Sequence, residues 1–260
     1  MSSPTASHTA RYPSLAGRKV FVTGGGSGIG AQIVSMFAAQ GAQVAFVDIA
    51  EAASRTLADA IVARGDPKPW WRLCDVRDVA ALQGAIGEAA KALGDFHVLV
   101  NNVANDDRHA LDAITPAYFD ERIAVNQRAA LFALQAVVPG MQRLGFGSIV
   151  NIGSNSWRMK NGDMPCYTMA KASMSGLTRG TATPLGRHRI RVNTVMPGWV
   201  MTERQKSLWL TPDGEKEIEH NQCLPDRVQP EDIAAMVLWL GADDSHMCTA
   251  QEFCVDGGWT

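Results

Sequence analysis

Seven short runs of β-branched and aromatic residues alternate with helix-length stretches along this 260-residue chain. Several of these runs are apolar throughout, which is typical of parallel strands covered on both faces. The predicted strands are Lys19–Thr23, Val44–Ile49, Trp71–Val76, His97–Asn101, Ser148–Ile152, Arg191–Met196 and Glu252–Val255. The predicted helices are Gly28–Gln40, Ala50–Arg64, Val79–Leu93, Ala117–Leu144, Cys166–Leu185 and Glu231–Leu240. Because such alternation implies right-handed crossovers, we expect an α/β fold with a single doubly wound, Rossmann-type domain and a seven-stranded parallel sheet flanked by helices.

Composition narrows the class of protein. Residues 1–14 are polar and small, which predicts a flexible N-terminal tail, and no linker or repeat divides residues 15–260. The net charge of -2 gives no electrostatic attraction to nucleic acid, so no nucleic-acid partner is expected. No apolar run reaches the ~20 residues that span a bilayer, so no membrane partner is expected. The five cysteines lack a CxxC pair and the six histidines lack metal-ligand spacing. This pattern indicates reduced thiols, no metal site and a cytoplasmic protein.

A glycine-rich loop, Thr23–Gly30, joins the first predicted strand to the first predicted helix. Glycines permit positive φ and let the backbone approach a pyrophosphate, whose charge a helix N-terminus favours. The motif alone also fits a tight strand-to-helix turn, but the strand before it and the helix after it favour a dinucleotide site. The expected cofactor-binding residues of this loop are Gly24, Ser27, Gly28, Ile29 and Gly30.

Acidic and amide residues follow the next strands. Asp48 ends the second strand, where an acid bonds the adenosine ribose hydroxyls and repels the 2′-phosphate of NADP, so the expected cofactor is NAD. The alternative is that Asp48 only caps the following helix. Asp75 is placed to bond the adenine edge while Val76 packs on the ring. The Asn101-Asn102 pair ends the fourth strand, where amides can tie neighbouring strand ends together. Asn101 is expected to be structural, and Asn102 is expected to bind the cofactor.

Tyr167 and Lys171 lie four residues apart, so a helix places both on one face. A free phenol titrates near ~10, and the lysine ammonium together with a positively charged nicotinamide is expected to lower that pKa, which would make Tyr167 a base. Ser154 ends the fifth strand and can donate a hydrogen bond to the substrate oxygen. Tyr-x-x-x-Lys alone is common on amphipathic helices, but with this serine and the dinucleotide loop it indicates a hydride-transfer centre.

From about Leu15 to Trp259 the sequence resembles the short-chain dehydrogenase/reductase family. The motifs that carry the resemblance are the glycine loop, Asp48, Asp75, Asn101-Asn102, Val125-Asn126, Ser154, Tyr167, Lys171, Arg191-Val-Asn193, Pro197-Gly198 and Val255-Asp-Gly-Gly258. It implies a dinucleotide-binding catalytic domain over residues 15–260. The family commonly forms homotetramers, so a homotetramer is expected here.

The resemblance also implies individual roles. Tyr167 is the general base, Lys171 also holds the nicotinamide ribose, and Ser154 positions the substrate. Asn126 bends its helix and retains a water of the proton relay. The remaining cofactor-binding residues are Pro197, Gly198, Val200 and Thr202, of which the threonine bonds the nicotinamide carboxamide.

Two positions depart from the family pattern. Val103-Ala104 replaces the usual Ala-Gly after the fourth strand, so a slightly shifted cofactor ribose is expected. Thr183-Pro184 replaces the usual acidic residue, and the proline is expected to bend or close its helix because it lacks a backbone donor. Neither change touches the expected proton path, so activity should survive.

The expected substrate residues follow the fourth, fifth and sixth strands, at the sheet edge where ligands bind in such folds. They are Asn105, Asp107, Arg108, His109, Ser156, Trp157, Trp199, Gln205 and Trp209. Residues 203–223 are predicted to form a lid over the site. Tryptophan faces with carboxylates and amides suit polyhydroxylated ligands, although solvated charges and core tryptophans would give the same composition.

Four segments of the chain together resemble the bacterial aldose dehydrogenases of the D-xylose 1-dehydrogenase type. They are Asn105–His109, Asp120–Asn126, Ser154–Trp157 and Thr211–Glu215. The resemblance implies an oxidoreductase of carbohydrate metabolism that oxidises the anomeric hydroxyl of an aldose to an aldonolactone. One alternative is an NAD-dependent dehydrogenase of a deoxy-keto sugar acid or other secondary alcohol, with a cation facing its carboxylate; the candidates are Arg108, Arg158, Lys160 and Arg204. A non-catalytic NAD-binding regulator is a third, less favoured because the catalytic residues are all present.

Overall fold

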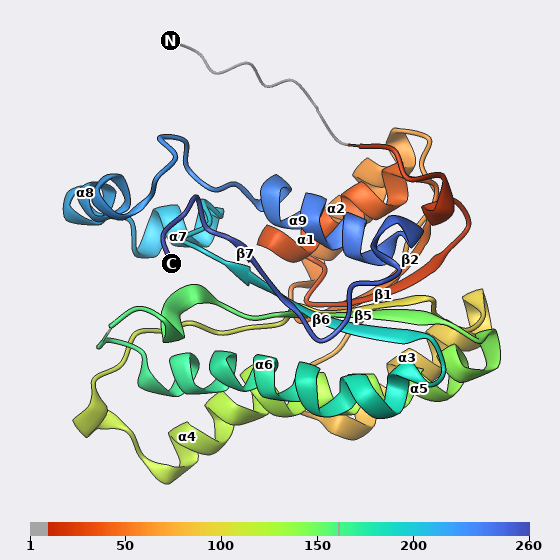
Figure 1. Cartoon of the computed structure of the whole chain (residues 1–260), viewed down its shortest axis with the longest axis horizontal. Helices are drawn as coiled ribbons and strands as arrows, with labels where there is room; N and C mark the ends of the chain where they lie inside the picture. The colour runs from red at the N-terminus through yellow and green to blue at the C-terminus, as the bar shows by residue number, and fades with distance from the viewer. Residues whose placement is uncertain (1–9, 161) are drawn as a thin grey trace.

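The computed structural model describes residues 10–160 and 162–260, and it confirms the single α/β architecture (Figure 1). Its parallel strands are β1 (Lys19–Thr23), β2 (Gln43–Asp48), β3 (Trp70–Leu73), β4 (Val98–Asn101), β5 (Gly147–Ile152), β6 (Ile190–Pro197) and β7 (Glu252–Val255). They lie in the order β3-β2-β1-β4-β5-β6-β7. Since the strand order reverses between β1 and β4, a crevice is expected at the carboxyl ends of these two strands.

Helices cover both faces of the sheet (Figure 1). They are α1 (Gly28–Ala39), α2 (Glu51–Ala63), α3 (Val79–Leu93), α4 (Pro116–Ile123), α5 (Ala129–Leu144), α6 (Pro165–Gly186), α7 (Glu203–Leu208), α8 (Pro212–Asn221) and α9 (Pro230–Gly241). Helices α1, α2 and α9 lie on one face, and α3, α5 and α6 lie on the other. The short helices α7 and α8 together occupy the segment predicted as the lid.

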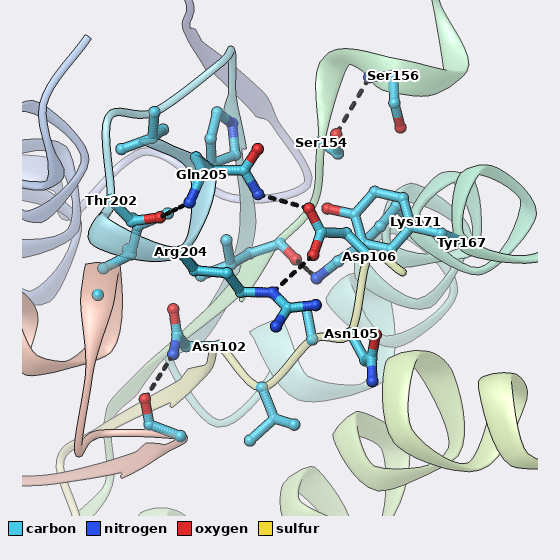
Figure 2. A pocket seen from close by; sticks show the side chains of 18 of the residues that line it. Asn102, Asn105, Asp106, Ser154, Ser156, Tyr167, Lys171, Thr202, Arg204 and Gln205 are labelled. Carbon is cyan, nitrogen blue, oxygen red and sulfur yellow. Dashed lines mark hydrogen bonds and ion pairs between the residues drawn. The ribbon is translucent and has the colours of Figure 1, made fainter. Parts of the chain in front are cut away.

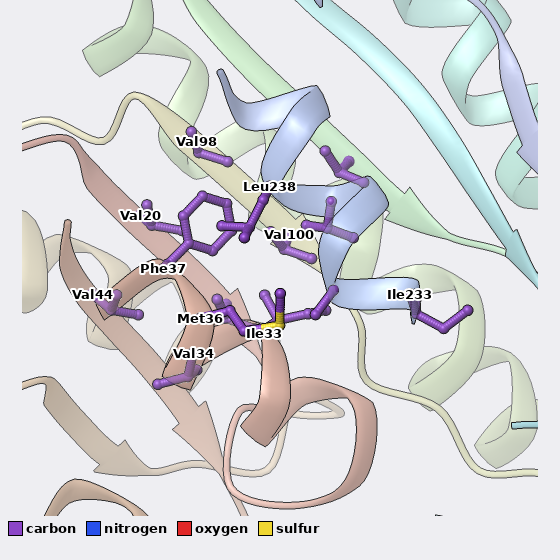
Figure 3. Packing of buried hydrophobic residues seen from close by; sticks show 14 of the residues in the cluster. Val20, Ile33, Val34, Met36, Phe37, Val44, Val98, Val100, Ile233 and Leu238 are labelled. Atoms are coloured by element: carbon purple, nitrogen blue, oxygen red, sulfur yellow. The ribbon is translucent and has the colours of Figure 1, made fainter. Parts of the chain in front are cut away.

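Each face of the sheet has its own apolar core. On one face, Phe37 of α1 and Leu238 of α9 are fully buried against Val98 and Val100 of β4 (Figure 3). On the other face, Phe21 packs edge-on against Phe96 with 5.2 Å between the ring centroids. Full burial of each such side chain contributes about 1.5–3 kcal/mol, so the sheet is a rigid platform for the loops at its carboxyl edge.

The helix predicted over Ala117–Leu144 is interrupted. Ala124–Arg128 forms a π-helical turn between α4 and α5, so one extra residue is inserted into the helical path. Asn126 lies within this turn, and its side chain bonds the backbone of Asn105 instead of facing solvent. The interruption therefore has a tertiary cause that helical periodicity does not reveal.

Other boundaries differ by a few residues. The third strand ends at Leu73 rather than Val76, because the Asp75 side chain accepts a 2.9 Å bond from the Arg77 backbone and turns the chain. Helix α6 continues two residues beyond Pro184, so the proline lies within its last turn.

The expected tail lies partly outside the described residues, because residues 1–9 are not among them. Residues 10–14 contact the domain: Tyr12 N–H donates to Gln40 Oε1 at 2.9 Å, and Gln40 Nε2 donates back to Ala10 O at 2.9 Å. In the part of the chain that the structure describes, no helix has the length and apolar character needed to cross a membrane.

Candidate active site

A cavity of about 1160 Å³ opens at the carboxyl edge of the sheet, where the strand order reverses. Every residue expected to hold the cofactor lines it, from the glycine loop through Asp48, Asp75 and Val76 to Asn102 and the segment between Pro197 and Thr202. Ser154, Tyr167 and Lys171 line the same cavity (Figure 2). The volume exceeds the ~300–1,000 Å³ of ordinary ligand pockets, which suits a dinucleotide together with a second small molecule.

The glycine loop has no side chains that would prevent a ligand from approaching its backbone closely. Gly24 and Gly28 have φ of 69° and 53°, a region that L side chains rarely adopt. A Cβ at Gly30 would lie 1.8 Å from the carbonyl oxygen of Gly24, so only glycine fits there. The N-terminus of α1 follows directly and favours a negatively charged group, so the loop fits the pyrophosphate of a nicotinamide dinucleotide.

The acid of β2 is held in place by backbone amides. Asp48 accepts 2.8 Å hydrogen bonds from the N–H groups of Gly26 and Ala50, and it is 9% exposed toward the cavity. Next to it, Ile49 is 71% exposed. This part of the cavity therefore presents a fixed carboxylate beside an exposed, uncharged side chain.

Two of the expected cofactor contacts have protein partners. The Asp75 carboxylate is bonded by the Arg77 guanidinium, which holds the pKa of this acid below its usual range. Asn102 donates to Gly24 O at 2.8 Å, and Asn101 donates to Asn151 Oδ1 at 2.8 Å. The two asparagines thus join β1, β4 and β5 at their carboxyl ends.

Tyr167 and Lys171 face the cavity from one side of α6 (Figure 2). Lys171 is 2% exposed, and its ammonium donates a 2.6 Å hydrogen bond to Ile152 O and lies 5.9 Å from the centre of the Tyr167 ring. Ser154 Oγ accepts a 3.1 Å bond from Ser156 N–H, which leaves the serine hydrogen free to donate.

Lys171 and a positively charged nicotinamide were together expected to lower the pKa of Tyr167, and the polypeptide without its cofactor does not produce that shift. Burial and the nearby Asp106 carboxylate raise the pKa of Tyr167 to about 12, although the Ser154 hydroxyl acts in the opposite direction. Burial also lowers the pKa of Lys171 to about 8. The chain therefore makes the phenol a weaker acid, and a phenolate at neutral pH needs a further positive charge at this position.

Asn126 does not line the main cavity. It borders, with Lys171, an adjoining cavity of about 10 Å³, close to the smallest space that holds one water. Its Oδ1 accepts from Asn105 N–H at 2.7 Å and its Nδ2 donates to Asn105 O at 3.1 Å. This paired contact fixes the loop after β4 against the π-helical turn.

The loop after β4 is joined by charged side chains to α7, in the segment predicted as a lid (Figure 2). Arg204 of α7 pairs with Asp106 at 3.2 Å and also with Asp107, while Gln205 donates to Asp106 at 2.5 Å. Asp107 additionally pairs at 3.4 Å with Arg122, whose side chain is buried. Two acids from one loop therefore hold α7 against the cavity, which several of its residues line.

The expected substrate residues divide into two groups. Those that line the cavity are Asn105, Arg108, Ser156, Trp199 and Gln205. Those that do not are Asp107, His109, Trp157 and Trp209. The second group contacts other protein groups: Asp107 bonds arginines, His109 bonds backbone, and Trp157 and Trp209 lie under the guanidinium groups of Arg158 and Arg108 at 5.1 Å each. Sequence spacing cannot reveal this division, because adjacent loop residues point in different directions.

Comparisons with known proteins agree with this geometry. A family model described as "Enoyl-(Acyl carrier protein) reductase" matches residues 24–260. The chain is 48% identical to D-xylose 1-dehydrogenase of Caulobacter vibrioides, over 96% of this chain and 99% of that protein. It is 45% identical to a probable galactose dehydrogenase of Rhizobium meliloti, over 96% and 98% of the two chains. The chain belongs to the short-chain dehydrogenase/reductase family.

Solved structures of this family have the same fold. A short-chain dehydrogenase/reductase from Serratia marcescens superposes with a TM-score of 0.88 at 32% identity, covering 95% of this chain and 99% of that one. A 7α-hydroxysteroid dehydrogenase solved with NADH and a steroid ligand gives a TM-score of 0.91 at 31% identity, with 96% of each chain covered. This chain is thus an oxidoreductase with the NAD(P)-binding fold of its family.

The sequence analysis did not identify Asp106 as a site residue. Of the two acids in the loop after β4, however, Asp106 is the one that lines the cavity. Its carboxylate lies beside the Tyr167 hydroxyl (Figure 2). The signal was present as two consecutive acids, Asp106 and Asp107, but the sequence does not tell which one faces the site. Trp259, near the C-terminus, also lines the cavity.

Proposed function

We propose that this short-chain dehydrogenase oxidises the anomeric hydroxyl of a neutral aldose to the aldonolactone, with NAD as the cofactor. Support comes from the convergence of Ser154, Tyr167 and Lys171 on one cavity with the glycine loop and Asp48. The relatives named for D-xylose and galactose support the choice of an aldose.

NAD would be held by the glycine loop at its pyrophosphate, by Asp48 at the adenosine ribose, and by Lys171 and Thr202 near the nicotinamide. When bound, it supplies the hydride acceptor and a positive charge beside the phenol. Asp48 supports NAD over NADP because its carboxylate would repel a 2′-phosphate, and the neighbouring Ile49 carries no positive charge to pair with one.

Residues of the chain bind the substrate oxygen and remove the proton of the anomeric hydroxyl. Ser154 Oγ–H donates to the anomeric oxygen and holds it beside Tyr167, whose Oη removes the hydroxyl proton. Lys171, anchored on Ile152 O, places a buried positive charge under the tyrosine ring. Asn126 borders the same small cavity as Lys171, which supports its role in passing the proton onward.

The charges around the cavity favour a neutral sugar over a sugar acid. Three of the four cations that could face a substrate carboxylate have anionic partners instead: Arg108 pairs with Asp163, Arg158 with Glu252, and Arg204 with Asp106. A substrate carboxylate near Tyr167 would also meet Asp106, and like charges repel.

One observation keeps the sugar-acid dehydrogenase as the second candidate. Lys160 lines the cavity, and it forms none of the ion pairs found among the described residues. If a sugar acid were the substrate, Lys160→Met would abolish its turnover. For a neutral aldose, the same change should leave turnover within about threefold.

The decisive experiment follows NADH formation with a panel of pentoses, hexoses and their acids. Neutral aldoses should react, with a preference for NAD over NADP, and Tyr167→Phe should reduce kcat by about 10²–10⁴-fold. The absence of turnover with every neutral aldose would overturn the proposal, as would full activity of the phenylalanine variant.

We further propose that the enzyme works as a cytoplasmic homotetramer, as is common in its family. The cysteines of the described chain are all free thiols, which supports a reducing compartment. Mass photometry of the purified enzyme tests the tetramer directly.

A further inference from the structure

His109 uses both of its ring nitrogens for bonds to the backbone. Nε2 accepts a 3.1 Å hydrogen bond from the Cys166 N–H, which lies 57 residues further along the chain. Nδ1 lies 2.9 Å from the carbonyl oxygen of Asp107. The backbone N–H of His109 also donates a hydrogen bond to Asp163 O at 2.7 Å. The imidazole ring packs against Tyr118 with 5.0 Å between the ring centroids. A side chain used in this way has no ring nitrogen left for a substrate.

The start of α6 explains why this contact matters. Pro165 is the first residue of the helix and has no N–H, so the first helical amide belongs to Cys166. First-turn amides have no partner within their own helix, and the N-cap residue here, Met164, makes no side-chain cap bond. His109 therefore supplies, from a distant loop, the acceptor that a serine or aspartate cap would normally provide.

The geometry also fixes the tautomer of the imidazole. Because Nε2 accepts from an N–H group, it carries no hydrogen, so the hydrogen of the neutral ring is on Nδ1 and points to Asp107 O. Protonation of the ring would place a second N–H against the Cys166 amide and break the cap. The groups that face the ring are the Tyr118 phenol of α4, the peptide of Asp107, and the Asp163–Cys166 segment with the Arg108–Asp163 ion pair.

We propose that His109 is a positioning residue: it caps the catalytic helix and fixes the backbone immediately before Tyr167. Through Asp107 O and Asp163 O, the same residue joins the loop that carries Asp106 to the start of α6. The inference rests on the proposed role of Tyr167 as the base. Since the reacting atoms must be aligned to within a fraction of an ångström, loss of the cap should affect the chemical step more than substrate binding.

Two conservative substitutions separate the two ring nitrogens. The side-chain amide of glutamine reaches about as far as Nε2, so His109→Gln keeps an acceptor for the Cys166 N–H. The amide of asparagine reaches only as far as Nδ1, so His109→Asn keeps the bond to Asp107 O and loses the cap. The two variants are therefore matched controls for each other.

The cap can be measured without turnover. In the wild-type protein, ¹⁵N shifts of the His109 ring should show hydrogen on Nδ1 only, and the Cys166 amide should be protected from hydrogen exchange. Protection should fall by at least about tenfold in His109→Asn and stay within about threefold in His109→Gln. An unprotected Cys166 amide in the wild type, or a hydrogen on Nε2, would overturn the inference even if no variant folded.

Kinetics then connect the cap to the reaction. His109→Asn should lower kcat by about tenfold with the sugar KM within twofold, and His109→Gln should keep kcat within about threefold. Unchanged kcat with an equally raised sugar KM in both variants would instead make His109 a substrate-binding residue and refute the proposal. Failure of the tyrosine mechanism would show separately, as activity retained in Tyr167→Phe while Cys166 protection still followed the His109 pattern.

Discussion

The Lys171 ammonium donates a 2.6 Å hydrogen bond to the carbonyl oxygen of Ile152, so a buried positive charge is anchored on the end of β5. The end of β5 thereby fixes the position of the Lys171 ammonium relative to the Tyr167 ring. Burial is also the reason that the pKa of this lysine falls to about 8 from its ordinary value of 10.5.

Lys171→Met should stabilise the protein while reducing its activity. Because the lysine pKa is lower in the folded than in the unfolded state, the unfolded state binds more protons between pH 8 and 10.5, and wild-type stability rises across this window. The methionine variant lacks that term, so its Tm should exceed the wild-type value by roughly 5 °C at pH 7, with the gap closing toward pH 10.5. Thermal unfolding at several pH values measures this, and exposed Lys216→Met is the control. A gap that widened with pH would contradict the assignment.

Asp106→Asn should move the pH dependence of turnover to lower pH. The Asp106 carboxylate raises the pKa of Tyr167, so removing its charge lowers that pKa and makes the base available in more acidic solution. The rising limb of kcat/KM should therefore shift toward lower pH. Asp107→Asn is the matched control, since this neighbouring acid does not line the cavity and should leave the limb in place. An upward shift for Asp106→Asn would refute the electrostatic argument.

Cofactor choice should depend on Asp48 and Ile49. Asp48→Ala should reduce kcat/KM for NAD by at least about tenfold, because a charge-assisted hydrogen bond to the ribose is lost. Adding Ile49→Arg should reverse the preference toward NADP, since the arginine can pair with the 2′-phosphate. The ratio of kcat/KM for the two cofactors measures the change, and Ile49→Ala alone should not alter it. A double variant that still preferred NAD would show that other residues set the choice.

Arg204→Ala should loosen the lid. The arginine pairs with Asp106 and Asp107, and each partly exposed pair contributes up to about 1 kcal/mol, so the sugar KM should rise about 3- to 10-fold. Limited proteolysis should cleave residues 203–223 faster in the variant. Lys216→Ala on α8 removes an exposed pair with Asp213 and serves as the control. Unchanged KM and cleavage would mean that the lid is held by other contacts.

The sequence alone determined the fold and the outline of the site. Strand and helix periodicities are local, so the order of the elements could be predicted. Some of their ends were displaced, as at Leu73, and one predicted helix is interrupted by the π-helical turn at Ala124–Arg128. The glycine loop and the spacing of Tyr167 and Lys171 are also local patterns, and the residues of both patterns line one cavity in the structure. Periodicity and spacing carry these features because the bonds that produce them join near neighbours in the chain.

The tertiary structure alone decided the chemistry around that outline. It shows that Asp106 rather than Asp107 faces the cavity, that Arg204 is bonded to both acids, and that His109 caps α6. It also shows that burial and the Asp106 carboxylate raise the pKa of Tyr167 in the polypeptide without its cofactor. These properties depend on distances between segments about 60 to 100 residues apart and on exclusion of water, and neither is written in local sequence.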